Sequence, residues 1–410
     1  MMTSNASAAF VWIWLPGEVD PVVAGRLEQQ GDRLLFTYGR SFRELSNAIA
    51  FSPVELPLQE GTFEPAGMNT IHPCLRDAAP DAWGRRVVAY KYPGLDASEL
   101  DYLLLSASDR IGALDFQPSS TEYVPRGLNH SELGELLEAA SLIERNQPLP
   151  PSLDHALLHG TSVGGARPKA LISDGNEQYI AKFSSSTDTH NVVKGEYVAM
   201  RLAKQAGIDV AEVLLKNTLG RDVLLVKRFD RTPVEEGAYR HAMLSGLSLL
   251  GLNEMEARYA SYQKLADLIR QHFISPRETL HELYRRLVFN ILIGNTDDHA
   301  RNHAAFWDGK MLRLTPAYDL CPQVRTGQEA TQAMQLEGAE GSHSTLKNVL
   351  SICASFQLDT QSARGIINAL LATIEKYWPE MCDEAEMTTV ERERFWQRAI
   401  LNPYCFQGWK

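Results

Sequence analysis

The chain has 410 residues, of which 44% are hydrophobic and 22% charged, and its 40 Lys and Arg against 51 Asp and Glu give a formal net charge of −11. This composition is typical of a folded protein with a sizeable core, and it argues against a small stapled scaffold, a disordered chain or a membrane protein. The negative charge opposes broad binding to nucleic acid, so any contact with DNA or RNA would have to be local or delegated to a partner. Five scattered cysteines without a CxxC pair favour the reducing cytoplasm over a disulfide framework or a zinc site.

The N-terminal segment is predicted to form a mixed α/β region. Ala8–Leu15 is apolar, but it is too short to cross a bilayer and no Lys or Arg precedes it, so we interpret it as a buried first strand. Leu34–Tyr38 and Ala48–Phe51 are further strand candidates between turn signals. No association with a membrane is expected.

The middle of the chain changes to a β-rich pattern. Asp174-Gly175-Asn176 separates the β-rich runs Lys169–Ser173 and Gln178–Phe183, which predicts a hairpin. The other elements expected here are a helix with Ser131 as N-cap that ends before Asn146, a helix over Gly195–Gln205, and a hairpin of Glu212–Leu215 and Val223–Val226.

The remainder is predicted to be mainly helical after Phe229-Asp230-Arg231. Leu280–Ile293 has its apolar residues on one helical face. A polar segment follows, and then a hairpin of Ala304–Trp307 and Met311–Leu314 around Asp308-Gly309. The sequence thus predicts a small β-rich lobe followed by a larger helical one.

A glycine-rich loop, Gly160–Lys169, opens the β-rich lobe. Its glycines would let backbone N–H groups approach phosphate oxygens, and Arg167 and Lys169 would offset the phosphate charge. An ordinary flexible turn with solvated basic side chains is the alternative. A Walker A loop does not fit, because Ala166 stands where that motif needs Lys and because a strand rather than a helix follows.

A lysine and a glutamate follow this loop. Lys182 alternates out of the apolar strand Tyr179–Phe183, and Glu196 lies in the first turn of the next helix. Kinases use a strand lysine held by a helical glutamate to orient the α and β phosphates of ATP. The alternative is that Lys182 faces solvent on an edge strand and Glu196 is a favourable charge near a helix N-terminus.

The polar segment Gly294–His303 follows the apolar helix directly. Asp297 and Asn302 have the D-x4-N spacing of a kinase catalytic loop, and Asp319 lies beyond the hairpin like the metal-binding Asp of a kinase DFG segment. Phosphoryl transfer needs a carboxylate near the attacking hydroxyl and oxygen ligands for Mg²⁺. The segment therefore predicts a phosphotransferase site.

Two other interpretations of this segment stay open. Asp297, Asp298, His299, His303 and Asp319 are residue types that also bind transition metals in hydrolases, although that would leave the glycine loop, the strand lysine and the helical glutamate without a role. The segment can also be an acidic loop that caps neighbouring helices, with its two histidines as structural donors.

The ordered motifs resemble the HipA family of bacterial serine/threonine kinases, the toxins of HipBA-type toxin–antitoxin modules. The resemblance rests on SVGGARPK (162–169), YIAKF (179–183), VKRFDR (226–231), GNTDDHARN (294–302) and LTPAYDL (314–320). The N-terminal segment is more loosely similar, through Gly39-Arg40-Ser41, Pro57 and His72-Pro73 to Asp81. The resemblance as a whole implies an α+β, bilobal protein-kinase-like fold. This fold would consist of an extra N-terminal α/β subdomain (1–115), a β-rich N-lobe (116–229) and a mainly helical C-lobe (230–410).

The resemblance also implies ATP and Mg²⁺ as cofactors and roles for single residues. Asp297 would be the catalytic base, Asn302 and Asp319 would hold Mg²⁺, and Glu196 would support Lys182. Lys227, Arg228 and Phe229 would form the hinge that meets adenine, with Asp230 near the ribose. The other residues implied to bind ATP are Val163, Gly164, Gly165, Ala166, Arg167, Pro168, Lys169 and His299.

Regulation and partners are implied in the same way. Ser162 matches the loop serine that the family autophosphorylates to switch the kinase off, and Thr161 adds a second hydroxyl beside it. The implied target is a host protein, with an aminoacyl-tRNA synthetase as the family precedent, and the implied partner is a HipB-like DNA-binding antitoxin that contacts DNA for the complex. The alternatives are a small-molecule phosphotransferase and a catalytically silent binding subunit.

Overall fold

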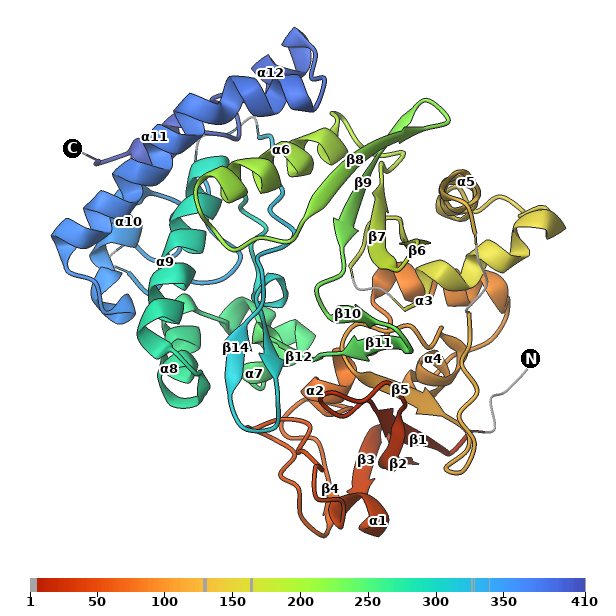
Figure 1. The fold of residues 1–410 in the computed structure, drawn as a ribbon. Coiled ribbons are helices and arrows are strands. Elements are labelled where there is room, and N and C mark those ends of the chain that lie inside the picture. Colours follow the sequence, from red (N-terminus) through yellow and green to blue (C-terminus); the bar gives the residue numbers. More distant parts are fainter. Residues whose placement is uncertain are drawn as a thin grey trace. The chain divides into compact units, whose positions relative to one another are not determined.

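The computed structural model describes residues 6–127, 131–162, 165–325, 327, 329–338 and 340–409. The chain divides into two compact units, whose elements are labelled in Figure 1. Unit 1 comprises Met1–Thr187, Lys216–Leu244 and Phe306–Lys310, and unit 2 comprises Asp188–Leu215, Ser245–Ala305 and Met311–Lys410.

Unit 1 begins with a five-stranded sheet in the order β4-β3-β2-β1-β5, drawn in red to gold in Figure 1. The predicted first strand is confirmed as β1 (Ala8–Ile13), which pairs antiparallel with both β2 (Val22–Gln30) and β5 (Leu114–Gln117). The predicted strand at Leu34–Tyr38 is confirmed as β3 (Arg33–Tyr38), and β4 is Thr62–Phe63.

The prediction of a strand at Ala48–Phe51 is wrong. Its apolar residues are buried by aromatic packing instead: the rings of Phe51 and Tyr38 lie 5.2 Å apart, and the N–H of Phe51 donates to the Tyr38 hydroxyl at 2.9 Å. The short helices around this sheet are α1 (Arg40–Arg43), α2 (Pro73–Arg76), α3 (Ala82–Lys91) and α4 (Glu99–Leu105).

A second sheet has the order β6-β7-β9-β8. Both predicted hairpins are confirmed, as β6 (Lys169–Asp174) with β7 (Glu177–Phe183) and as β8 (Val213–Thr218) followed by β9 (Arg221–Lys227). One face of β7 packs with α5 (Leu133–Glu144) in a hydrophobic core. The remaining elements of this part are η1 (Pro151–Gly160), β10 (Arg231–Val234) and β11 (Gly237–Arg240), with β12 (Ala242–Ser245) at the unit boundary.

Two details of this region differ from the predictions. Helix α5 begins after Glu132 rather than Ser131, because Glu132 and Glu135 form a capping box. The chain after Asp230 does not turn helical at once, since β10 and β11 pair as a short hairpin whose polar residues carry little hydrophobic alternation.

Unit 2 is mainly helical. Its central helix is α9 (Pro276–Ile293), and the predicted apolar face of Leu280–Ile293 is buried. Helix α6 (Val192–Gln205) begins three residues before the predicted start, because the Asn191 side chain caps the N–H of Lys194. The other elements are α7 (Gly246–Leu249), η2 (Glu254–Tyr259), α8 (Tyr262–His272), η3 (Ala300–Asn302), β13 (Ala304–Trp307, partly in unit 1), β14 (Leu312–Leu314), α10 (Leu346–Ser351), η4 (Cys353–Phe356), α11 (Thr360–Glu384), α12 (Thr389–Phe395) and η5 (Pro403–Phe406).

Within the described ranges, no helix combines the length and the apolar character that crossing a bilayer requires.

Candidate active site

The predicted catalytic loop leaves the C-terminal end of α9 at Gly294. This residue has a φ of +68°, and a Cβ here would lie only 2.4 Å from the carbonyl oxygen of Ala399, so glycine suits both the turn and the contact. The N–H of Asn295 then donates to the carbonyl of Asn290 at 2.9 Å. The buried helix thus ends abruptly and presents the polar loop at a fixed place in unit 2.

The two adjacent aspartates of the loop have opposite environments. Asp297 is exposed, whereas Asp298 is 1% exposed and its carboxylate accepts hydrogen bonds from the Tyr262 hydroxyl and, at 3.0 Å, from His303 Nε2. The N–H of Met334 also donates to the Asp298 carbonyl at 3.0 Å. Asp298 therefore anchors the loop from the inside, and Asp297 stays available at the surface.

The structure brings Asn302 and Asp319 to the same place. Asn302 Nδ2 donates to the carbonyl of Asp297 at 3.4 Å, and Asn295 Nδ2 donates to the carbonyl of Asp319 at 3.4 Å. Asp319 has a φ of +59°, an uncommon backbone conformation for an aspartate that is often found at functional sites. Unit 2 therefore gathers the predicted base and both predicted metal ligands.

The electrostatics of this group suit a hard cation. Although Asp297 is exposed, the protein around its carboxyl group reduces the hydration of that group, and this desolvation raises the pKa of Asp297. The Asp319 and Asp298 carboxylates raise that pKa further, and His299 opposes the rise. Neighbouring carboxylates that repel each other, together with an amide oxygen, are the donors that Mg²⁺ prefers. In addition, the buried Nδ1 of His299 has no hydrogen-bond partner among the described residues. The residues present therefore fit a magnesium–nucleotide site.

The alternative of a transition-metal hydrolase is not supported. Asp298 and His303 bind each other and Tyr262 in the interior. In the part of the chain that the structure describes, no three His, Cys, Asp or Glu side chains are arranged to hold a metal ion.

In unit 1, the start of the glycine loop is buried. Ser162 is 4% exposed and its hydroxyl donates to the carbonyl of Asp109 at 2.9 Å. The Thr161 hydroxyl accepts from the N–H of Ala107 at 2.9 Å and donates to the Leu158 carbonyl at 2.8 Å. Of the predicted ATP-binding residues, Val163 and Gly164 lie outside the described residues.

The other end of the loop is held by α3. The N–H of Gly165 donates to Asp81 Oδ2 at 2.6 Å, and the N–H of Trp83 donates to the Gly165 carbonyl at 3.1 Å. The Trp83 indole also donates to the carbonyl of Lys169 at 2.9 Å. Sequence reasoning missed Asp81 and Trp83 as loop contacts, since neither carries a local signal. Farther along the loop, Ala166 is exposed and the Pro168 carbonyl accepts from Phe183.

Lys182 shares one face of the sheet with other candidate nucleotide contacts. Lys169 is opposite Lys182, and Leu171 is opposite Ile180, which in turn is opposite Val226. Directly paired residues of antiparallel strands point to the same face. This face therefore combines two lysines with an apolar surface, as phosphates and a flat base require.

The predicted hinge lies beside a buried ion cluster. Arg228 binds both Asp109 and Asp230 at 2.8 Å, and Arg231 also binds Asp230 at 2.8 Å. Burial alone would raise the pKa of Asp109, but Arg228 and Arg231 outweigh it and lower that pKa to about 2. For Asp230 too, burial is outweighed by the same arginines, and its pKa falls far below the usual range.

One backbone N–H of the predicted hinge already forms a hydrogen bond within the sheet. The N–H of Arg228 donates to the carbonyl of Gln178 at 2.8 Å, which continues the sheet. Lys227 pairs with Glu177 at the surface, and the rings of Phe229 and Phe306 meet edge to face. An adenine contact of this segment and a ribose contact of Asp230 stay predictions.

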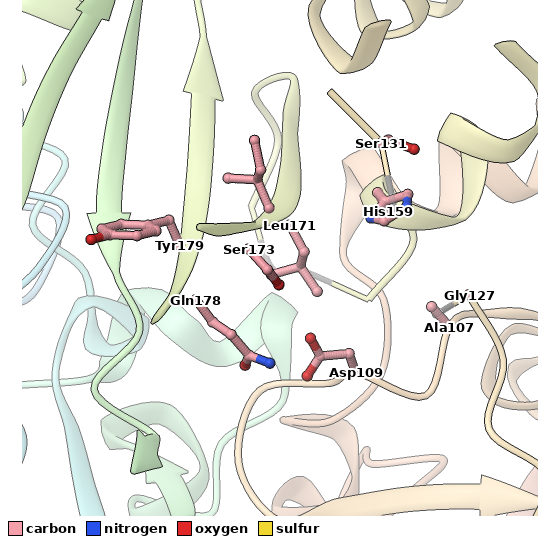
Figure 2. Close-up of a pocket in the computed structure, with 10 residues that line it drawn as sticks. Ala107, Asp109, Gly127, Ser131, His159, Leu171, Ser173, Gln178 and Tyr179 are labelled. Carbon is pink, nitrogen blue, oxygen red and sulfur yellow. The ribbon is translucent and has the colours of Figure 1, made fainter. Parts of the chain in front are cut away.

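A pocket of about 150 Å³ opens between this cluster and the β6–β7 hairpin. Figure 2 shows the side chains of Asp109 and Gln178 pointing toward each other on its lower side, with Leu171, Ser173 and His159 above them. The volume is below the range of about 300–1,000 Å³ that drug-sized ligands occupy. This pocket, as the described residues line it, is therefore smaller than a nucleotide requires.

Glu196 lies in α6 of unit 2, where it is buried, whereas Lys182 lies in unit 1. The ion pair between them stays a prediction.

These observations define a mixed helix-and-sheet protein with a kinase-like fold and an additional N-terminal domain. The family model for the HipA N-terminal domain matches residues 15–117, and the model for the HipA-like C-terminal domain matches residues 161–378. The second match covers more than half of the chain, so the chain belongs to the HipA family of kinases.

Individual relatives agree with this assignment. The chain is 25% identical over 333 residues to Y4mE of Sinorhizobium fredii, described as a candidate kinase, with 76% of this chain and 77% of the relative covered. It is 28% identical over 183 residues to the serine/threonine-protein kinase toxin HipA of Shewanella oneidensis, covering 39% and 42%. Among solved structures, HipA from a Shewanella oneidensis MR-1 complex of HipA, HipB and operator DNA has a TM-score of 0.72 and 19% identity, with 97% of each chain covered.

Proposed function

We propose that the chain is an ATP- and Mg²⁺-dependent serine/threonine protein kinase. The observation that carries the proposal is the grouping of Asp297, Asn302 and Asp319 at the end of a buried helix in a HipA-family chain. Asp297 accepts the proton of a serine or threonine hydroxyl while that oxygen forms its bond to the γ-phosphorus and ADP leaves. Asn302 and Asp319 hold Mg²⁺, which neutralises charge on the phosphates when bound.

The remaining contacts to the nucleotide are proposed from the family resemblance. Lys182 binds the α and β phosphates with support from Glu196, the loop from Gly164 to Lys169 covers them, and Val163 is a further proposed ATP contact. The hinge at Lys227–Phe229 contacts adenine, Asp230 lies near the ribose, and His299 contributes from the catalytic loop. The shared face of Lys169, Lys182 and the apolar strand residues supports this assignment.

Modification of Ser162 is the proposed off-switch. Its hydroxyl is buried against the Asp109 carbonyl, where a phosphate with nearly two negative charges has no room. The loop must therefore leave this position for the serine to be modified, and it cannot return afterwards. Thr161 is equally enclosed, so peptide mapping is needed to decide between the two hydroxyls.

The biological setting is proposed from the family. The substrate is a host protein, with an aminoacyl-tRNA synthetase as the precedent, and its phosphorylation stops translation and growth. A HipB-like antitoxin is the proposed partner, in line with the HipB and operator DNA present in the similar Shewanella complex. The net charge of −11 leaves the DNA contact to that partner, and the cytoplasm is the proposed location.

The test is γ-phosphate transfer from ATP by wild type, Asp297→Asn and the surface control Asp267→Asn, all dephosphorylated first. Asp297→Asn should lose at least about a hundredfold in rate, since it removes the proton acceptor. The control should match wild type, because Asp267 is 67% exposed on α8. Equal rates for wild type and Asp297→Asn would exclude the assigned base, and transfer to a metabolite but to no protein would favour a small-molecule phosphotransferase.

A further inference from the structure

A C-terminal segment of unit 2 packs against two glycines that precede site residues. We call this segment, residues 388–402, the C-terminal brace; it contains α12 and the turn after it. Gly195 directly precedes Glu196, and Gly294 precedes Asp297 by three positions. Each glycine lies where the brace leaves no space for a side chain.

The first contact lies at the start of α6. A Cβ on Gly195 would lie 2.5 Å from Cζ of Phe395, whose ring is 1% exposed. The His190 ring meets the same phenyl ring edge on, with 5.3 Å between centroids, and Asn191 Nδ2 donates to Glu391 Oε1 at 3.2 Å. Glycine is less favourable than alanine within a helix, so helix stability does not explain Gly195. The close approach of the Phe395 ring, which leaves no space for a Cβ, does explain it.

Helix α11 and the turn that directly follows it make three further contacts with α6. The Tyr197 hydroxyl donates to Glu384 Oε1 at 2.6 Å, Arg201 forms an ion pair with the same carboxylate at 3.0 Å, and Lys194 Nζ donates to the Glu386 carbonyl at 2.8 Å. Figure 1 shows α6 running beside α11 and α12. The helix that carries Glu196 is therefore fixed by the C-terminal helices along its length.

The second contact lies where the catalytic loop begins. A Cβ on Gly294 would lie 2.4 Å from the Ala399 carbonyl oxygen, and the N–H of Leu401 donates to the Leu292 carbonyl at 2.7 Å. The brace thus satisfies a carbonyl at the C-terminal end of α9. Trp396 stacks on Trp378 of α11 with 5.4 Å between ring centroids, which anchors the brace between its two contacts.

We propose that the C-terminal brace positions Glu196 and Asp297 relative to each other, with Phe395 as a positioning residue. The inference rests on the proposed function, in which Glu196 supports Lys182 and Asp297 takes the proton. In kinases, the placement of the helix that carries this glutamate controls activity. Here one short segment contacts both that helix and the start of the catalytic loop, so displacement at one contact moves the other.

The test compares Gly195→Ala with Gly365→Ala. Gly365 is exposed within α11, and among the described residues no atom beyond the neighbouring backbone of its own helix lies within 4 Å of the position that its Cβ would take. Gly195→Ala should lower kcat by roughly tenfold to a hundredfold, because small displacements of site groups are costly. Gly365→Ala should leave kcat unchanged.

A double variant tests whether the contact with Phe395 is the cause. Adding Phe395→Leu to Gly195→Ala removes ring atoms opposite the new methyl group and should restore most of kcat, so the effects of the two substitutions would not be additive.

A second measurement needs no nucleotide. Amide hydrogen exchange over residues 294–298 should be faster in Gly195→Ala than in wild type or Gly365→Ala, since the brace transmits the shift. A folded Gly195→Ala variant with unchanged kcat and unchanged exchange at 294–298 would overturn the proposal, even if its melting temperature falls. If wild type transfers no phosphate, the proposed function fails, while the exchange experiment still decides the role of the brace.

Discussion

At the scale of single residues, the site depends on how Asp297 and Asp298 divide their roles. Asp298 is enclosed and accepts from Tyr262 and His303, so its position is set by the interior. Asp297 is exposed, but the protein around its carboxyl group reduces the hydration of that group, and this desolvation together with the neighbouring carboxylates raises its pKa. The carboxylates of Asp297 and Asp319 repel each other, so a cation bound near them would be stabilised while Asp297 serves as a proton acceptor. The buried Asp298 holds the loop rigidly in place, as such a site requires.

Tyr262→Phe should destabilise the protein, because it removes a hydrogen-bond donor from the buried Asp298 carboxylate. We expect a loss of about 1–3 kcal/mol in the free energy of unfolding. Tyr284→Phe is the matched control: Tyr284 is equally buried, but its hydroxyl makes a long 3.4 Å bond to the Val349 carbonyl. Denaturant unfolding measures both variants, and equal losses would contradict the anchoring role of Tyr262.

The Asp109 cluster predicts how stability depends on pH. The folded-state pKa of Asp109, about 2, lies below its unfolded value near 3.9, so its contribution is present above about pH 4 and is lost as the pH falls toward 2. The contribution is about 3 kcal/mol. Unfolding free energies measured from pH 6 to pH 2 should fall less steeply for Asp109→Asn than for wild type. Parallel curves would show that Asp109 does not contribute in this way.

The site residues predicted from the sequence all carry a local signal. Asp297, Asn302 and Asp319 follow kinase spacing within one stretch of chain, and the structure brings them together. Asp81 and Asp109 were missed as glycine-loop contacts, because they are ordinary residue types whose partners, Gly165 and Ser162, lie 84 and 53 positions away. Such contacts exist only after folding.

At the scale of elements, local patterns predicted the hairpins of the second sheet and the buried helix α9. They failed where tertiary packing replaces a regular pattern, as at Ala48–Phe51, where aromatic contacts with Tyr38 bury apolar residues without a strand. They also missed β10 and β11, whose short polar strands lack hydrophobic alternation. Element identity was therefore predictable where burial is periodic along the chain.

The contact between α3 and the glycine loop gives an element-scale prediction. A Cβ on Gly84 would lie 2.6 Å from the Thr161 carbonyl oxygen, so Gly84→Ala should force α3 away from the loop and cost about 1–3 kcal/mol in stability. Gly134→Ala in α5 is the control, because the nearest atom to its Cβ is 3.8 Å away. Thermal unfolding should show a lower Tm for Gly84→Ala only, and the reverse order would refute the close docking of α3.

At the scale of the whole molecule, the proposed function requires an acidic chain to bind a highly charged nucleotide. In the proposed site, Lys169, Lys182 and the glycine-rich loop place positive charge next to the phosphates. Mg²⁺ bound by Asn302 and Asp319 would add further positive charge there. The fold assignment is carried by the family match, whereas the nucleotide site is a proposal.

Mg²⁺ and ATP together should therefore stabilise the folded protein. At about 100 times the dissociation constant, a ligand adds about 2.7 kcal/mol, which a thermal shift detects. Asp319→Asn should reduce the shift, and chelation of Mg²⁺ should abolish it. A dephosphorylated wild type whose Tm does not respond to Mg²⁺ and ATP would argue for a silent binding subunit.

The most direct measurement of the central claim is the phosphoproteome of cells after brief expression of wild type or Asp297→Asn at equal levels. The account predicts that at least one serine or threonine of a host protein gains phosphate with wild type and not with Asp297→Asn. Indistinguishable phosphoproteomes for the two proteins, both folded and expressed, would contradict it.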